Sequence, residues 1–211
     1  MIIGMSGYNI QAILFDADGV TQLPGDFILY TEERYGWTEQ QYQDFFHTLF
    51  TKDSYKEALR GDADFIDVLA DNLDEFDCDC NAGDFMYEWL HHNIVIDEEL
   101  WRHIGKLRSN GTKCYLASNQ EKRRAQYIRN DLGYERHFDR LFFSCELGVL
   151  KPLPDYFKKI LEAISIPPTE VLFFDDYEDS VITAESLGIK AEVYKDYSTY
   201  LEVIEGYGLL K

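Results

Sequence analysis

The sequence predicts an α/β fold in which helices cover both faces of a Rossmann-like, doubly wound parallel sheet, with an inserted α-helical cap. Three observations predict it. Short apolar runs alternate with helical patterns from Asp97 onward, and one similar run stands alone before residue 20. Between them, helical patterns follow one another without a strand. The charge also shifts: 18 acidic and four basic residues lie between Val20 and Asp97, against 21 and 16 elsewhere.

The first strand is predicted at residues 12–15, where the apolar run AILF ends at Asp16. Such a run is typical of a strand buried on both faces of a parallel sheet. Asp16 and Asp18 lie two residues apart, so on an extended chain their carboxylates project into one space. Open α/β sheets bind ligands at this carboxyl edge. The same residues, with Gly19, are also typical of a plain turn, and this stretch alone leaves both interpretations open.

Residues 20–96 are predicted to form the cap, and residues 1–19 and 97–211 the α/β core. Helical patterns cover residues 38–50, 62–73 and 83–92, and Thr38 with Gln41 has the spacing of a capping box. The aromatic stripes of these helices are interpreted as the hydrophobic core of the cap. Residues 93–97 are predicted to be a linker back to the core.

From Asp97 onward helices and strands alternate in order. Helices are predicted at residues 97–111, 120–133, 154–165 and 180–188. Strands are predicted at residues 113–118, 140–144, 170–176 and 190–194. Gly111 and Gly133 stand where helices usually stop.

Reactive side chains follow the later strands too. Ser118 ends one strand, Lys151 precedes a proline-rich helix start, and Asp175 and Asp176 end another apolar run. If these ends converge on the first pair of aspartates, four carboxylates meet a hydroxyl and an ammonium group. Crowded carboxylates repel one another unless a cation binds, and an all-oxygen ligand set suits Mg²⁺. A Mg²⁺ ion together with a lysine and a hydroxyl group makes a phosphate-binding site. A carboxylate beside that site can attack phosphorus and form an aspartyl-phosphate.

The ordered set FDADGV, LASN, LGVLKP and FFDD resembles the four motifs of the haloacid dehalogenase-like hydrolase superfamily, over residues 12–194. Four motifs in order are far more specific than any one of them. The resemblance implies a magnesium-dependent phosphatase that hydrolyses a small phosphorylated metabolite through an aspartyl-phosphate. Two alternatives stay open: a phosphosugar mutase, which returns the phosphoryl group to its substrate, and an acidic binding protein without turnover.

The resemblance also implies a role for each matching residue. Asp16 would be the nucleophile. Asp18 would protonate the leaving alcohol and then activate water. Ser118 and Asn119 would bind the phosphoryl group, and Lys151 would both bind it and neutralise its charge.

The implied magnesium ligands are Asp16, Asp18, Asp175 and Asp176. The chain departs from the family pattern at Ser180, where many members have Asn or Asp, which leaves the role of the neighbouring Asp179 open. It departs again at Leu153, where an acid is usual, although Asp155 follows. The name-giving dehalogenases lack the acid at the position of Asp18, so its presence favours phosphoryl transfer.

The composition of the chain excludes some classes of binding partner. The net charge of −19 disfavours nucleic acid and anionic membranes, and its concentration in the cap favours a small monophosphate, of a sugar or a nucleoside, over a polyphosphate. The first ten residues lack the pattern of a secretory signal, and the four cysteines form no zinc pattern, so reduced thiols in the cytoplasm are expected. The sequence leaves the oligomeric state undecided.

Several charged residues are interpreted as structural. Residues 77–88 partly match a calcium loop, but Ala82 replaces its glycine, so an acidic linker with Asn81 capping a helix is favoured. Arg123 and Arg124 are expected on a solvated helix face, although one of them could approach phosphate. The cap cations are interpreted as surface residues: His47, Lys52, Lys56 and Arg60.

Overall fold

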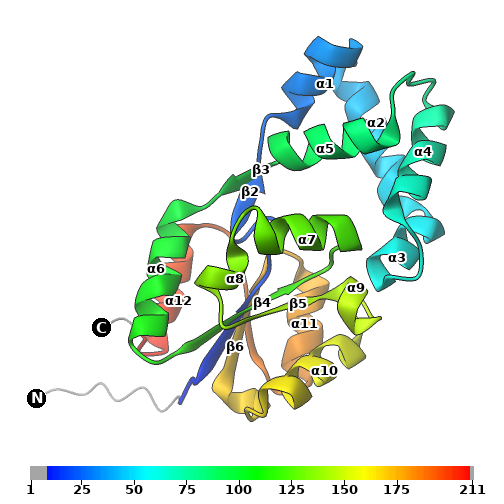
Figure 1. The fold of residues 1–211 in the computed structure, drawn as a ribbon. Helices are drawn as coiled ribbons and strands as arrows, with labels where there is room; N and C mark the ends of the chain where they lie inside the picture. The colour runs from blue at the N-terminus through cyan, green and yellow to red at the C-terminus, as the bar shows by residue number, and fades with distance from the viewer. Residues whose placement is uncertain (1–8, 210–211) are drawn as a thin grey trace, which may run out of the picture.

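A computed structural model of the chain describes residues 9–209 and shows a parallel five-stranded sheet (Figure 1). Its strand order is β5-β4-β1-β6-β7, with every neighbouring pair parallel. The strands are β1 (Ala12–Phe15), β4 (Lys113–Ser118), β5 (Arg140–Phe143), β6 (Val171–Asp175) and β7 (Lys190–Val193). β1 lies at the centre and is buried throughout, as its apolar sequence predicts. The predicted α/β fold class is confirmed.

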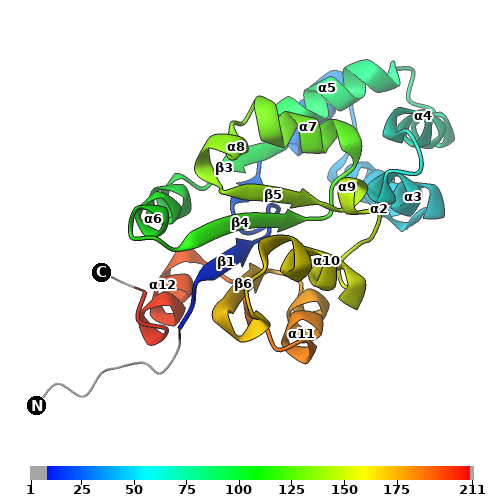
Figure 2. The ribbon, with the colours of Figure 1, turned by 60° about the horizontal axis from the view of Figure 1, so that its bottom comes forward.

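Helices cover both faces of this sheet (Figure 2). Alternate residues of β1 enter different hydrophobic clusters: Phe15 packs with side chains of α6, α7 and α12, whereas Leu14 packs with those of α10 and α11. The core helices are α6 (Glu98–Ser109), α7 (Lys122–Asn130), α8 (Tyr134–His137), α9 (Ser144–Leu147), α10 (Pro154–Ile164), α11 (Glu178–Ser186) and α12 (Tyr197–Gly206), with the short helix η1 (Pro168–Glu170) before β6. Helix α12 was not predicted from the sequence.

Five helices form the inserted region above the sheet: α1 (Phe27–Tyr35), α2 (Glu39–Thr51), α3 (Asp53–Arg60), α4 (Phe65–Glu75) and α5 (Ala82–His92). Their buried residues make a separate hydrophobic cluster rich in aromatic rings, centred on Phe45 and Phe85. The capping box of Thr38 and Gln41 is confirmed, and Asn81 caps α5 by accepting hydrogen bonds from two backbone N–H groups. The preference for a capping role over a calcium loop therefore agrees with the structure.

The connection between this region and the core differs from the linker that was predicted from the sequence. Residues 94–96, predicted to be part of a linker, form strand β3 (Ile94–Ile96), which pairs antiparallel with β2 (Gln22–Pro24). This two-stranded ribbon carries the chain out of the core and back (Figure 1). The predicted division into residues 1–19 with 97–211 and 20–96 stays a prediction, and its residues 1–8 and 210–211 lie outside the described part.

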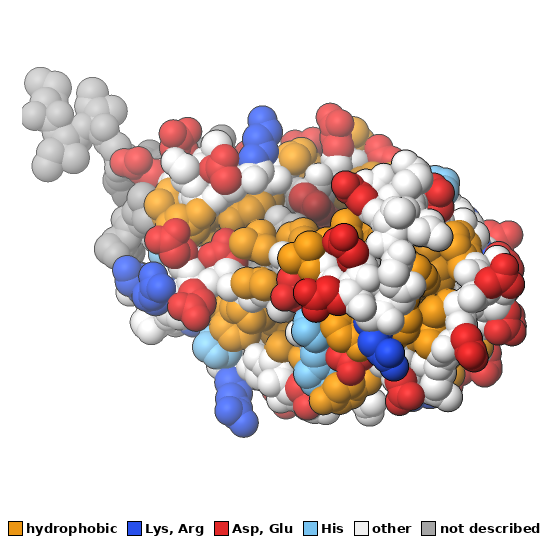
Figure 3. Space-filling view, turned by 90° about the horizontal axis from the view of Figure 1, so that it is seen from above, with side chains coloured by type: hydrophobic (Ala, Val, Ile, Leu, Met, Phe, Trp, Pro, Cys, Tyr) orange, Lys and Arg blue, Asp and Glu red, His pale blue; other side chains and the backbone are white. Residues whose placement is uncertain are grey.

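The surface of the cap is strongly acidic. Figure 3, which looks onto the molecule from above, shows acidic side chains scattered across the visible face among few basic ones.

None of the helices within residues 9–209 combines the length and apolar character needed to cross a membrane. The four cysteines are free, while most of the segment considered as a secretory signal lies outside the described residues.

Candidate active site

The predicted site residues lie where the sheet changes its winding direction. From β1 the chain continues to β4 and β5 on one side of the sheet and then crosses to β6 and β7 on the other side. Asp16 follows the last residue of β1, while Ser118 and Asp175 end β4 and β6. Ligands of open α/β sheets bind at such a switch point, outside the carboxyl ends of the strands. The fold therefore brings these three residues to one edge.

Three carboxylates cluster at this edge. One oxygen of each of Asp16, Asp175 and Asp176 lies within 4.8 Å of the others. Gly19 makes the approach of Asp176 possible, since its φ of +73° suits glycine and a Cβ atom there would collide with the Asp176 carboxylate. Asp18 does not place its carboxylate in this cluster.

The ligand chemistry of this cluster fits Mg²⁺. All its donors are carboxylate oxygens, the class that this ion prefers. Burial and the neighbouring Asp175 raise the pKa of Asp176, as expected for carboxylates crowded together.

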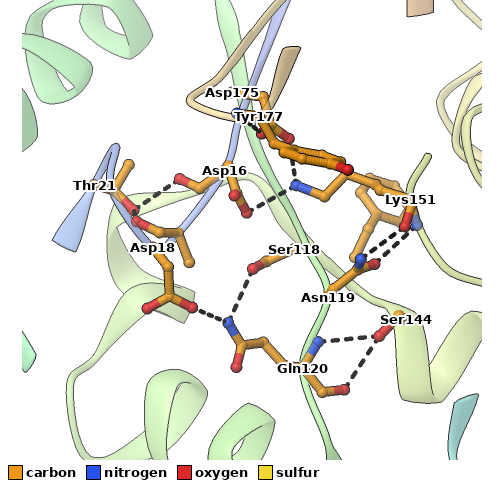
Figure 4. A network of polar contacts seen from close by, with 12 residues as sticks. Asp16, Asp18, Thr21, Ser118, Asn119, Gln120, Ser144, Lys151, Asp175 and Tyr177 are labelled. Atoms are coloured by element: carbon orange, nitrogen blue, oxygen red, sulfur yellow. Dashed lines mark hydrogen bonds and ion pairs between the residues drawn. The ribbon is translucent and has the colours of Figure 1, made fainter. Parts of the chain in front are cut away.

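Lys151 supplies the positive charge beside the cluster. Its Nζ lies 2.9 Å from Oδ1 of Asp16 and donates a hydrogen bond to Oδ2 of Asp175 at 2.6 Å (Figure 4). Burial alone would lower the pKa of Lys151, but the two carboxylates outweigh it and raise the pKa above its ordinary value. Burial raises the pKa of Asp16 to about 7, against the opposing attraction of Lys151.

Asn119 holds the segment that carries this lysine. Its side-chain amide donates to the backbone carbonyl of Lys151 at 2.9 Å and accepts from the Lys151 backbone N–H at 2.9 Å. The predicted role of Asn119 in binding substrate stays a prediction, and in the structure its side chain makes these two bonds to the protein backbone.

Asp18 lies at the rim of the site, with its side chain 53% exposed. Its carboxylate accepts hydrogen bonds from Gln22 and Gln120, each at 2.8 Å, and from Nη2 of Arg124 at 2.5 Å. Gln120 also donates to Oγ of Ser118 at 3.0 Å, which links the two predicted catalytic side chains (Figure 4).

The expectation for Arg124 is wrong. Its side chain is 8% exposed and pairs with Asp18, and its guanidinium lies over the ring of Trp89 in the cap. Arg123, one residue earlier, does lie at the surface and pairs with Asp64. Arg124 stands four residues before the buried Ile128, on the same face of α7, and this spacing was the available signal.

Gln22 and Gln120 were also missed. Both are almost fully buried, and the sequence around them gives no signal for the partner of either side chain. Of the positions that depart from the family pattern, Ser180 is buried, while Asp179 is exposed and accepts a hydrogen bond from Tyr177. Asp155 pairs with Lys158 at the surface.

A family model of haloacid dehalogenase-like hydrolases matches residues 10–188, which include all of these motifs. The chain belongs to this family of hydrolases. The predicted resemblance is thereby confirmed, and with it the prediction that the protein is a hydrolytic enzyme.

Relatives of known activity are distant. The chain is 22% identical to rat bifunctional epoxide hydrolase 2, covering 93% of this chain but only 38% of that protein, so it spans well under half of that relative. It is 24% identical to the phosphorylated carbohydrates phosphatase of Thermotoga maritima, covering 86% of this chain and 83% of the phosphatase.

Solved structures share the fold. A haloacid dehalogenase family enzyme from Bacteroides thetaiotaomicron superimposes with a TM-score of 0.76 at 22% identity, covering 92% of this chain and 98% of that enzyme. L-2-haloacid dehalogenase from Xanthobacter autotrophicus gives a TM-score of 0.67 at 23% identity, covering 93% and 83%.

Proposed function

We propose that this hydrolase is a magnesium-dependent phosphatase that cleaves a small phosphomonoester through an aspartyl-phosphate on Asp16. The observation that carries the proposal is the placement of the Asp16 carboxylate. It lies beside the ammonium group of Lys151 and within the carboxylate cluster, at the switch point of the sheet. The likeness to a phosphorylated carbohydrates phosphatase supports the same reaction class.

In the first step a carboxylate oxygen of Asp16 attacks phosphorus, and the bond from phosphorus to the alcohol oxygen breaks. Asp18 gives its proton to that oxygen, so the product leaves as a neutral alcohol. Lys151 stabilises the negative charge on the phosphoryl oxygens. Ser118 is placed to help, because its Oγ accepts from Gln120 and its own proton remains available to a phosphoryl oxygen.

In the second step water attacks the phosphorus of the acyl-phosphate, and Asp18, now a carboxylate, takes the proton of that water. Inorganic phosphate leaves and the Asp16 carboxylate is restored. Asp18 can serve both steps because its carboxylate lies at the rim, where alcohol and water can reach it.

Asp16, Asp175 and Asp176, with the backbone carbonyl of Asp18, would hold Mg²⁺. When bound, Mg²⁺ supplies charge compensation for the phosphoryl group and the carboxylates around it. The side chain of Asn119 would also position Lys151, since it bonds to the backbone of that residue.

A hydrolysis screen across phosphorylated metabolites, with Mg²⁺ and then with chelator, tests the proposal. We expect phosphate release equal to substrate loss, dependent on Mg²⁺ and abolished in Asp16→Asn. Asp155→Asn is the control, because this exposed aspartate pairs with Lys158 at the surface. Conversion of a sugar 1-phosphate to its 6-phosphate without phosphate release would indicate a mutase. Binding without either product would indicate a binding protein.

A further inference from the structure

A cavity of about 370 Å³ lies beside Asp18, between the core and the cap. Its volume falls in the range of small-molecule pockets, roughly 300–1,000 Å³. Its core side is formed by Asp18, Asn119, Gln120 and Arg124. The cap is held against the core near this cavity, since Ser144 Oγ donates to the backbone carbonyl of Leu59 at 2.7 Å.

The cap side of this cavity is mainly aromatic, and the polar residue Asn93 also lines it. Five rings line it: Tyr42, Phe46 and Phe50 from α2, Tyr55 from α3, and Trp89 from α5. The ring of Phe50 lies next to three of the others. Its centroid is 5.4 Å from that of Phe46, 5.1 Å from that of Tyr55 and 6.2 Å from that of Trp89. Rings at these separations contact one another and present a continuous apolar surface.

Most polar groups of the core side already have partners in the protein, although Nε of Arg124 donates no hydrogen bond to a described residue. Gln120 and Arg124 both donate to Asp18, and the side chain of Asn119 bonds to backbone on both of its atoms. A ligand with many hydroxyl groups would lose water there and find few unpaired partners in return. Arg124 is the basic residue lining this cavity, and its charge is matched by Asp18, so a second phosphate would find no free cation.

The basic residues of the cap do not add a positive charge to the wall of this cavity. Lys52, Lys56 and Arg60 form ion pairs with acidic residues of the cap at its surface. None of them lines the cavity, and neither does His47.

We infer that this cavity binds the leaving group of the substrate, and that this leaving group is an apolar, ring-bearing alcohol esterified to a single phosphate. The inference rests on the proposed function, because it takes Asp18 as the acid that protonates the leaving oxygen. The wall of five rings would surround the ring of the alcohol, while its oxygen faces Asp18. A sugar monophosphate, considered from the sequence alone, fits this wall less well.

Benzyl phosphate and glucose 6-phosphate test the inference, because both are esters of primary alcohols and differ mainly in the group that enters the cavity. We expect kcat/KM to be higher for benzyl phosphate by about tenfold or more, the scale of discrimination in apolar pockets. Phe50→Ala should lower the ratio of the two kcat/KM values by about fivefold, because it opens the aromatic wall. Because Phe50 is 41% exposed, we expect this variant to fold.

Tyr87→Ala is the matched control, since Tyr87 is another exposed cap aromatic, outside this cavity. It should leave the ratio unchanged. If both esters are hydrolysed with equal efficiency, or Phe50→Ala leaves the ratio unchanged, the inference is overturned while the phosphatase proposal stands.

If neither ester is hydrolysed, the phosphatase proposal loses support and calorimetric titration of the unmodified protein decides about the cavity. Tighter binding of benzyl phosphate than of glucose 6-phosphate, weakened in Phe50→Ala, would support the apolar pocket. Equal binding, or none, would overturn it.

Discussion

Arg124 donates a hydrogen bond to Asp18 across 106 positions of the sequence, with 2.5 Å between Nη2 and Oδ1. The same guanidinium lies 5.2 Å from the ring centroid of Trp89 in the cap. One side chain thus contacts the proposed acid and base and the cap that covers it. Its position makes Arg124 a positioning residue for Asp18.

We expect Arg124→Gln to lower kcat by about tenfold, because Asp18 loses the charged partner that orients it. The Mg²⁺-induced rise in Tm should change little, since Arg124 lies outside the carboxylate cluster. Arg123→Gln is the control: its pair with Asp64 is exposed, and such pairs contribute at most about 1 kcal/mol. A wild-type kcat in Arg124→Gln would mean that Gln22 and Gln120 suffice to hold Asp18.

Mg²⁺ should stabilise the folded protein through the carboxylate cluster. An ion that binds only the folded state at a hundredfold excess over Kd adds about 2.7 kcal/mol to the free energy of unfolding. Asp176→Asn removes a proposed ligand together with a charge that repels Asp175. We therefore expect this variant to melt no lower than wild type in chelator and to lose most of the Mg²⁺-induced rise in Tm.

Thermal scans with Mg²⁺ and with chelator measure both effects, and Asp155→Asn should keep the full rise. If Asp176→Asn is much less stable in chelator yet keeps that rise, Asp176 is a structural residue and not a ligand.

Alanine substitutions at Gly19 and Gly133 distinguish the effect of backbone strain from the effect of a collision with the carboxylate of Asp176. Both have positive φ, +73° and +74°, so alanine at either position is strained by about 1–2 kcal/mol. Only at Gly19 would the new Cβ collide with the carboxylate of Asp176; at Gly133 nothing lies within 4 Å.

Gly19→Ala should therefore lose activity and the Mg²⁺-induced rise in Tm, whereas Gly133→Ala should lose only stability. Activity assays and thermal scans on both variants check this difference. Equal activity in the two variants would show that the Asp176 carboxylate can shift without consequence.

His103 should make stability depend on pH. It is buried in α6 with its Nδ1 2.9 Å from the hydroxyl of Tyr200, and burial lowers its pKa below the ordinary 6.5. The unfolded chain then binds more protons than the folded protein below pH 6.5. The stabilising contribution of neutral His103 is present above pH 6.5 and is lost as the pH falls toward its folded-state pKa.

Urea unfolding of His103→Gln between pH 5 and 7.5 should show a shallower fall in the free energy of unfolding than wild type. His47→Gln, at an exposed position in α2, is the control. An unchanged slope in His103→Gln would assign the acid sensitivity to other groups.

The sequence by itself determined the core fold and the residues at the edge of the sheet. Apolar runs such as residues 12–15 and 171–174, alternating with helical patterns, are typical of strands buried on both faces of a parallel sheet covered by helices. The acids that end these runs then meet at one edge, as Asp16 and Asp175 do. These conclusions need only periodicity and the rule that parallel strands share a carboxyl edge.

Only the tertiary structure decided how the rim of the site is built. Arg124 and Gln22 contact Asp18 because separate segments pack together, and charge and polarity in the sequence do not reveal such partners. The ribbon of β2 and β3 likewise needs pairing between segments about 70 residues apart, which strands of three residues are too short to signal. Tyr42 and Phe46 were recognised from the sequence as part of an apolar helical stripe, but which of the cap aromatics line the cavity beside Asp18 depends on how the cap packs over the core.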